Sequence, residues 1–315
     1  MRESKMKYFL GIDVGSVSVK LALVKGNDIV GKAYLRNSGL ISTVQEGLRQ
    51  LPKVKVFGVG ITGSGKDFVK ALVGADYVDS EILAHMVASL QEYPDVKTIL
   101  DIGGEDSKLS IINDGVLSDF QMNNSCAGGT GSMIETIATR LAVKIEDVGA
   151  IALKSTNPAL IAGKCGIFAQ SSAVSELSKG RPVEDILMGV SKALVGNYLA
   201  TLAKGKQLLP PIVFQGATAL NKALVKCFEE ELGYPVLVPE NCSFMGAIGI
   251  ALLTEENMNG HQSNFRGDAI LDPGYHTSTI HCKDCENNCE LLKLYHNDRL
   301  LSVNGSRCGK RVLTI

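Results

Sequence analysis

Short apolar runs separated by polar turns open the chain, and their order predicts a β-hairpin. Tyr8–Val14 is mostly apolar, the small residues Gly15 and Ser16 follow, and a second apolar run covers Val17–Val24. Strand, tight turn and strand in this order are typical of an antiparallel pair. A further turn leads into a third predicted strand, Asp28–Tyr34.

The same order of elements begins again about ninety residues later. Thr98–Ile102 is an apolar strand, Gly103 and Gly104 form a turn, and Ser107–Ile112 and Val116–Met122 are the next strands. An internal duplication is the simplest interpretation of this repeat. Two similar lobes would leave a cleft between them, with one hairpin on each wall.

Helical periodicity follows each hairpin and predicts a mixed α/β protein. The predicted helices are Thr43–Leu51, Asp67–Leu72, Ser80–Glu92, Gly131–Leu141, Ile167–Lys179, Val183–Gly205, Asn221–Leu232 and Ser243–Leu253. The remaining predicted strands are Lys53–Gly60, Ile212–Gln215 and Val236–Val238. The stretch Asn257–Gly274 is polar without a period and is interpreted as a linker.

Composition excludes several classes of function. The 315 residues suffice for two lobes and a small appendage. A net charge of −1 gives no electrostatic attraction for nucleic acid or for an anionic membrane. No apolar run approaches the ~20 residues of a membrane span, and the first residues lack the apolar segment of a signal peptide. We expect a soluble, cytoplasmic protein that binds neither nucleic acid nor membrane.

Both predicted hairpins carry the same polar arrangement at their first turn. Asp13 and Asp101 each end a buried strand, and glycines that allow backbone N–H groups to approach an anion follow them. A carboxylate there could hold hydrated Mg²⁺ or orient an attacking water. Two ordinary β-turns are the alternative, but their repetition at equivalent places favours phosphate binding. The candidate phosphate-binding residues are Gly15, Ser16, Val17, Ser18, Lys20, Gly103, Gly104, Glu105 and Asp106.

A third segment offers a place for a nucleoside. Gly216 and Ala217 follow a predicted strand, and Asn221 opens the next helix. A turn of small residues at this point can accept an adenine and a ribose. Gly129 and Thr130 complete the candidate nucleotide contacts.

With these motifs the chain resembles the actin/Hsp70/sugar-kinase superfamily of ATPases. The two phosphate motifs match Asp13–Lys20 and Asp101–Lys108, and the adenosine motif matches Gly216–Asn221. The resemblance implies α/β, duplicated ribonuclease H-like lobes around a central nucleotide cleft, with ATP and Mg²⁺ as ligands. The expected domains are lobe I at 1–95 and 239–255, lobe II at 96–238, a linker at 256–274 and a cysteine-rich module at 275–315.

A competing phosphate motif lies between the hairpins. Gly60–Asp67 follows a strand and resembles a P-loop, but Asp67 stands where Mg²⁺ binding needs Ser or Thr. A P-loop also leaves the two hairpins unexplained, so it is the weaker alternative.

Two of the eight cysteines point away from a sugar kinase. Cys126 and Cys165 each precede a predicted helix, where the helix dipole and free N–H groups favour a thiolate. Thiolates are good ligands for soft metals, so the two cysteines are interpreted as metal ligands. The alternative is that both are buried structural cysteines. A [4Fe–4S] cluster needs four thiolates, and a C₂ homodimer would supply Cys126 and Cys165 twice.

Residues 7–254 resemble the ATP-dependent activators of 2-hydroxyacyl-CoA dehydratases and related reductases that serve benzoyl-CoA reductase or double-cubane-cluster proteins. The most specific part is the segment Cys-Ala-Gly-Gly-Thr-Gly that begins at Cys126. In that family one cluster bridges a dimer, and ATP hydrolysis drives one electron to a partner iron–sulfur protein. The resemblance implies Cys126 and Cys165 as cluster ligands, Asp13 and Asp101 as residues serving Mg²⁺ and water, and ferredoxin or flavodoxin as donor.

The chain departs from the family pattern at two places. Gly128 stands where the family has a second Ala, and Gln170 and its neighbours stand where a Glu is usual. These changes affect local polar contacts and leave the ligands in place. A kinase of the same fold and a zinc-binding, nucleotide-sensing scaffold remain as alternative functions.

The last segment carries a second group of cysteines. Cys282, Cys285, Cys289 and Cys308 offer four thiolates in a short piece with little apolar content, which would need a metal to fold. A Cys₄ zinc site is the first choice and a second [4Fe–4S] cluster the alternative, with His281 as a possible replacement ligand. Cys227 and Cys242 are assigned no role, and His85 is assigned to helix packing.

Overall fold

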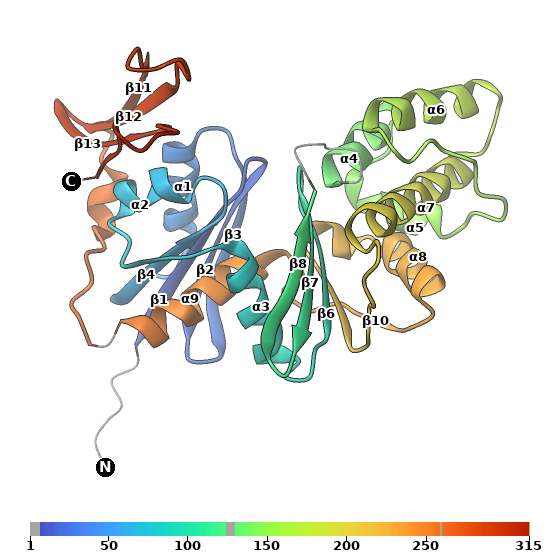
Figure 1. The fold of residues 1–315 in the computed structure, drawn as a ribbon, viewed down its shortest axis with the longest axis horizontal. Coiled ribbons are helices and arrows are strands. Elements are labelled where there is room, and N and C mark those ends of the chain that lie inside the picture. Colours follow the sequence, from blue (N-terminus) through green and yellow to red (C-terminus); the bar gives the residue numbers. More distant parts are fainter. Residues whose placement is uncertain (1–6, 124–129, 259, 315) are drawn as a thin grey trace. The chain divides into compact units, whose positions relative to one another are not determined.

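The computed structural model describes residues 7–123, 130–258 and 260–314 (Figure 1). The chain separates into two compact units, one formed by Met1–Ala88 with Gly246–Ile315 and the other by Ser89–Met245. We call them unit 1 and unit 2.

A five-stranded mixed sheet forms the centre of unit 1. Its strands are β1 (Tyr8–Val14), β2 (Ser18–Lys25), β3 (Asp28–Arg36), β4 (Val56–Thr62) and β5 (Tyr77–Val78). Their order is β3-β2-β1-β4-β5, with β1 antiparallel to β2 and parallel to β4. The apolar strand β1 is buried from its second residue onward because it lies in the middle, whereas β3 alternates in exposure because it forms an edge.

The helices of unit 1 cover this sheet. They are α1 (Leu40–Gln50), α2 (Lys66–Val73), the first part of α3 (Glu81–Glu92) and nearly all of α9 (Met245–Asn257). Glycines let α9 rest directly on two strands. A Cβ on Gly11 would lie 1.8 Å from the Ala247 carbonyl oxygen, and one on Gly60 would lie 2.0 Å from Thr254 Oγ1. This close packing fixes the first turn of α9 near the end of β1.

Unit 2 repeats the sheet of unit 1. Its strands are β6 (Thr98–Ile102), β7 (Ser107–Asn113), β8 (Val116–Met122), β9 (Ile212–Gln215) and β10 (Val236–Leu237). The order is β8-β7-β6-β9-β10, with β6 antiparallel to β7 and parallel to β9. Three antiparallel strands followed by two parallel ones are thus found twice, which confirms the predicted duplication.

Helices account for most of the rest of unit 2. They are α4 (Gly131–Arg140), α5 (Val148–Ala152), α6 (Gly166–Ser178), α7 (Val183–Leu202) and α8 (Lys222–Leu232), with short 3₁₀ turns at Ile145–Asp147, Ala217–Leu220 and Cys242–Phe244. The long helix α7 packs against α5, α6 and α8, and α4 packs against α6 (Figure 1). Tyr198 and Phe228 meet edge-to-face in this core, with ring centroids 5.4 Å apart.

The C-terminal segment forms a separate antiparallel sheet within unit 1. Its strands are β11 (Tyr275–His281), β12 (Glu290–His296), β13 (Arg299–Asn304) and β14 (Leu313–Thr314), preceded by a 3₁₀ turn at Gly267–Leu271. We call residues 275–314 the C-terminal module. Figure 1 shows it beside α1 and α2, and its Leu294 and Leu301 belong to the same buried cluster as Ile12 and Phe68.

Candidate functional site

The first phosphate turn is built around a buried carboxylate at the end of β1. Asp13 pairs directly across the strands with Lys20, and the Lys20 ammonium lies 3.2 Å from Asp13 Oδ2. The Gly15 N–H donates to the Ser18 carbonyl at 3.0 Å and closes the turn. Ser16 is exposed at its tip, whereas Ser18 is buried. A carboxylate, an ammonium group and a tight glycine turn therefore meet at one strand end.

Two neighbouring segments support this turn. The Asn37 side chain donates from Nδ2 to the carbonyls of Gly15 and Ser16, at 3.3 and 3.2 Å. On the other side, the Gly65 N–H donates to the Val14 carbonyl at 3.0 Å, and a Cβ on Gly63 would lie 2.8 Å from Asp13 Oδ1. The glycines of the P-loop-like segment are thus explained by contact with the first phosphate turn.

The first turn of α9 also reaches Asp13. A Cβ on Gly246 would lie 2.8 Å from His85 Nε2 and 3.1 Å from Asp13 Oδ2. His85, assigned to helix packing in the sequence, therefore faces the same small space as the Asp13 carboxylate. Nothing in the local sequence marks Asn37 or His85, because both reach the turn through the tertiary fold.

The second phosphate turn repeats the geometry of the first. Asp101 is the penultimate residue of β6 and pairs across the strands with Lys108, as Asp13 pairs with Lys20. The Lys108 ammonium lies 3.7 Å from Asp101 Oδ2 and 2.9 Å from Asp106 Oδ1. The Gly103 N–H donates to the Asp106 carbonyl at 2.8 Å. Glu105 is exposed at the tip.

The buried Tyr198 hydroxyl donates to the Lys108 carbonyl at 2.6 Å, and burial raises the pKa of Tyr198 well above its ordinary value. Its phenol therefore stays protonated and keeps donating. This contact ties the strand bearing Lys108 to helix α7.

The second turn is bonded to the beginning of α4. The N–H groups of Gly131 and Ser132 donate to the carbonyls of Gly103 and Gly104, at 2.9 and 2.8 Å. The N-cap residue of the helix, Thr130, is fully buried. The first helical N–H groups of α4 have no partner within the helix, and the carbonyls of the phosphate turn accept from two of them.

The predicted adenosine turn lies against the same phosphate turn. Gly216 has φ +88°, and a Cβ there would meet the Ile102 carbonyl oxygen at 2.4 Å and Asp101 Oδ1 at 2.9 Å. The Thr218 hydroxyl donates to the same Ile102 carbonyl at 2.7 Å. Asn221 caps α8, since its side chain accepts from the N–H groups of Ala223 and Leu224.

Of the two predicted cluster cysteines, Cys165 belongs to the described chain. It is half-buried and is the N-cap residue of α6, and its carbonyl accepts from Ala169 N–H at 2.8 Å. Large apolar side chains close to it in sequence are open to solvent: Leu160, Ile167 and Phe168 are 94%, 71% and 66% exposed. Cys126 and Gly129 lie outside the described residues.

The other cysteines divide by burial. Cys227 and Cys242 are buried, and burial raises the pKa of both thiols, that of Cys227 to about 11. In the C-terminal module Cys282 and Cys289 are buried, whereas Cys285 and Cys308 are exposed. Within residues 7–123, 130–258 and 260–314, no three His, Cys, Asp or Glu side chains already form a ligand set.

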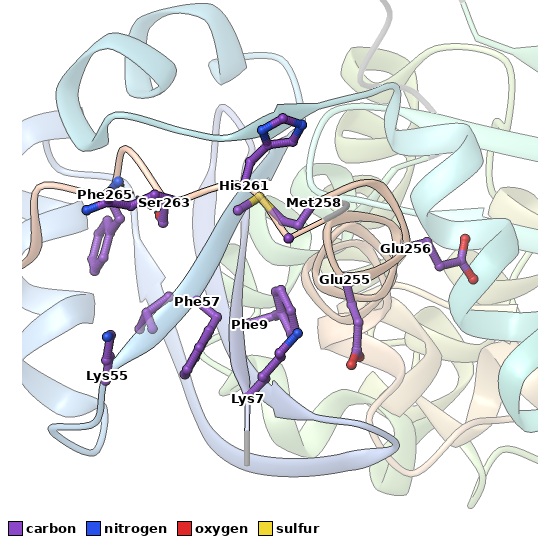
Figure 2. Close-up of a pocket in the computed structure, with 13 residues that line it drawn as sticks. Lys7, Phe9, Lys55, Phe57, Glu255, Glu256, Met258, His261, Ser263 and Phe265 are labelled. Carbon is purple, nitrogen blue, oxygen red and sulfur yellow. Dashed lines mark hydrogen bonds between the residues drawn. The ribbon is translucent and has the colours of Figure 1, made fainter. Parts of the chain in front are cut away.

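A hollow of about 750 Å³ lies in unit 1 at the opposite end of β1 from Asp13. Figure 2 shows Phe9 and Phe57 within it, with Lys7, Lys55 and Glu255 around them. The seven residues of β1 span roughly 20 Å, so this hollow is distant from the first phosphate turn. Its lining mixes charged side chains with aromatic rings.

The helices of the described chain are too short or too polar to pass through a bilayer.

Two equivalent sheets, each ending its central strand in a carboxylate followed by a glycine turn, define an ATPase of the actin-like class. A family model matches residues 10–254 and is described as the BadF/BadG/BcrA/BcrD ATPase family. The chain belongs to this family.

Three comparisons with individual proteins agree. The (R)-2-hydroxyglutaryl-CoA dehydratase activating ATPase of Acidaminococcus fermentans is 32% identical over 252 residues, which cover 78% of this chain and 96% of the relative. The crystal structure of component A of that dehydratase superposes with a TM-score of 0.73, covering 79% of this chain and 98% of the other. The activator of 2-hydroxyisocaproyl-CoA dehydratase from Clostridium difficile, solved with bound ADPNP, gives a TM-score of 0.72 at 28% identity, covering 79% of this chain and 94% of the other.

Proposed function

We propose that this protein is an ATP-driven one-electron reductase of a partner iron–sulfur enzyme. Two copies would hold one [4Fe–4S] cluster through Cys126 and Cys165 of each chain. The names of its relatives support a partner resembling a 2-hydroxyacyl-CoA dehydratase. A benzoyl-CoA reductase or a double-cubane-cluster protein is the related choice, with ferredoxin or flavodoxin as the electron donor.

One observation carries the proposal: the second phosphate turn is hydrogen-bonded to the start of α4. Gly103 and Gly104 accept from Gly131 and Ser132, and Cys126 lies only five residues before Gly131. A change in the turn on hydrolysis would therefore act directly on the helix that follows Cys126.

The carboxylates and lysines would handle the nucleotide. Asp13 and Asp101 would hold hydrated Mg²⁺ and orient the attacking water, while Lys20 and Lys108 balance the phosphate charge. The glycine turns, together with Thr130, Gly216 and Ala217, would bring backbone N–H groups to the phosphates and the nucleoside. A shift of ~200 mV in a one-electron potential corresponds to roughly 4–5 kcal/mol, within reach of a nucleotide-dependent change in conformation.

Cys165 and its neighbours have the chemistry that binding of a [4Fe–4S] cluster requires. Cys165 is the half-buried N-cap residue of α6, and a cysteine sulfur is the ligand that iron–sulfur clusters take. A bound cluster would supply a one-electron carrier at that point. The exposed Ile167 and Phe168 beside it offer the apolar surface that a second copy would cover.

The test is an anaerobic absorption spectrum with iron and sulfide analysis. Wild-type protein should show a charge-transfer band at roughly 400 nm and about four irons per two chains. Cys126→Ser and Cys165→Ser should each lose both, whereas Cys285→Ser, an exposed thiol elsewhere, should keep them. A band that survives either of the first two changes contradicts the cluster assignment.

A second measurement separates the nucleotide site from the cluster. Asp101→Asn should slow ATP hydrolysis roughly 100-fold or more while the iron content stays unchanged. Asp114→Asn is a matched control, because Asp114 is an exposed turn residue with φ +50°, a conformation that Asn tolerates. Equal hydrolysis by both variants would remove Asp101 from the site.

A further inference from the structure

The four cysteines of the C-terminal module lie in two loops of one small sheet. Cys282, Cys285 and Cys289 occupy the connection between β11 and β12, and Cys308 occupies the connection between β13 and β14. The strands follow one another in sequence order, and every neighbouring pair is antiparallel. In such a meander the first and third connections emerge at the same end of the sheet. All four thiols are therefore at one end.

An ion pair holds these two loops together. Arg311 donates from Nε and Nη2 to the two oxygens of Asp284, at 2.5 and 3.1 Å. Asp284 lies between Cys282 and Cys285, and Arg311 lies three residues after Cys308. This bidentate contact brings the loop of Cys308 against the loop of the other three cysteines.

Backbone contacts near the base of the loops support the same arrangement. The Cys282 N–H donates to the Cys289 carbonyl at 2.8 Å, which closes the first loop. Gly305, with φ +93°, opens the second loop so close to the first that a Cβ would lie 2.5 Å from the Glu290 carbonyl oxygen. Only glycine permits this approach.

The apolar core at this end of the module is too small to hold the loops. Its buried members are Cys282, Cys289, Leu291 and Val303, so half of them are cysteines. The described cysteines form no disulfide with one another. Small units with so little apolar burial usually depend on a metal or on disulfides.

We propose that Cys282, Cys285, Cys289 and Cys308 bind one structural Zn²⁺ ion. Four thiols would lose four protons to the solvent, and the ion would join the four sulfur atoms tetrahedrally at about 2.3 Å. Because no ready ligand set exists within the described residues, the exposed Cys285 and Cys308 would move inward onto the ion. The family match ends at residue 254, so this site would be an addition outside the shared ATPase body.

The polar composition of the two loops favours zinc over an iron–sulfur cluster. The reduction potential of an iron–sulfur cluster is set by the hydrogen bonds and the solvent exposure around it. Cys285 and Cys308 instead lie in exposed loops, and the residues around them include Lys, Asp, Glu and Asn. Zinc has no redox chemistry and tolerates such a position. The spacing of two residues between Cys282 and Cys285 serves both metals and does not discriminate.

The experiment uses the full chain carrying Cys126→Ser and Cys165→Ser, so that the proposed bridging cluster does not contribute. Anaerobically purified protein should contain about one zinc per chain by mass spectrometry, as one Cys₄ site predicts. Cobalt(II) in its place should give the ligand-field bands of a tetrahedral tetrathiolate. Adding Cys308→Ser should weaken zinc binding at least roughly tenfold, since losing an outer-shell partner alone costs about 10–100-fold.

Two further variants serve as controls for the zinc site. Cys227→Ala removes a thiol that packs against Met188 elsewhere and should keep the zinc. Cys308→His, which restores a zinc ligand, should recover binding even if Cys308→Ser folds poorly. If the variant with Cys126→Ser and Cys165→Ser contained iron and sulfide and showed an absorption band at roughly 400 nm, the four cysteines would hold a second cluster instead. No bound metal, or equal zinc in Cys308→Ser, would overturn the proposal.

Discussion

Asp13 and Asp101 each lie opposite a lysine seven residues further along the chain. The pairing Asp13 with Lys20 and Asp101 with Lys108 follows from the register of two equivalent hairpins. The hairpin therefore places an acid and a base at the same strand end without a long-range contact. This explains why a short motif in the sequence was sufficient to predict both hairpins and the position of each Asp in them.

Gly216 is the residue whose replacement should damage the second phosphate turn most directly. Gly216→Ala should lower the free energy of unfolding by about 2–4 kcal/mol, because Ala is strained at positive φ and its Cβ would strike the Ile102 carbonyl. Denaturant unfolding would measure this loss. Gly196→Ala is the control, since Gly196 lies on the exposed side of α7 with open space among the described atoms and should change stability by about 1 kcal/mol or less. Equal effects would contradict the argument.

The cysteines should differ sharply in reactivity. In native, metal-free protein at pH 8, iodoacetamide should modify Cys285 and Cys308 first, because both are exposed and hydrogen bonds from the Lys310 backbone and Ser306 lower the pKa of Cys308. Cys227 and Cys242 should stay unmodified, since burial raises their pKa and blocks access. Peptide mass spectrometry at successive times would measure the order in which the cysteines are modified. Early modification of Cys227 would show that the core of unit 2 opens.

At the scale of elements, apolar patterning predicted the central strands well. The structure confirms Tyr8–Val14, Thr98–Ile102 and Ile212–Gln215 as predicted, because buried central strands are apolar along their length and end abruptly at turn residues. The ends of helices were predicted less accurately than those of the central strands. The prediction that α7 reaches Gly205 was wrong, since the helix ends at Leu202 and Gly205, with φ +73°, lies in the following turn.

Other elements could not be predicted from the local pattern. The short α5 and β5 have too few residues for a period to show. In β11 every residue after Tyr275 is exposed, so the apolar alternation that marks a strand is absent. The segment predicted as a linker also contains a 3₁₀ turn at Gly267–Leu271, which the Gln45 side chain holds through the Ile270 carbonyl at 2.7 Å. Such contacts join residues more than 200 positions apart.

The start of α7 should make the stability of unit 2 sensitive to acid. Asp185 accepts from the Ser155 hydroxyl at 2.6 Å and the Asn157 N–H at 3.1 Å, and these bonds hold its pKa below the ordinary 3.8. A depressed pKa stabilises the fold above pH 3.8, and this stabilisation is lost as the pH falls through the lower, folded value. The free energy of unfolding should therefore drop on acidification below about pH 4.

Asp185→Asn tests this dependence. The variant should be less stable at pH 7 and should show a flatter stability curve below pH 4 than wild type, measured by urea unfolding at a series of pH values. The exposed Asp95→Asn should keep the wild-type curve. An unchanged slope in Asp185→Asn would show that other carboxylates dominate the acid response.

At the scale of the molecule, the C-terminal module is part of the core of unit 1. Leu294 is fully buried in the cluster that also contains Phe68 of α2 and Ile12 of β1. Leu294→Ala should therefore cost about 2–5 kcal/mol and speed amide hydrogen exchange in α2 and β1. Leu313→Ala, at a position 41% exposed, should change stability by about 0.5 kcal/mol or less. Faster exchange confined to the module would mean that the two parts unfold independently.

The shared core has a consequence for how the cell could set the amount of working protein. A ligand that binds only the folded module adds RT ln(1 + [L]/Kd) to the stability of whatever unfolds with it. The strand that carries Asp13 would unfold with it, because Ile12 and Leu294 lie in one cluster. At a free zinc concentration 100 times its Kd, the gain would be about 2.7 kcal/mol. By mass action, scarcity of zinc would then lower the concentration of folded ATPase without any change at the nucleotide site.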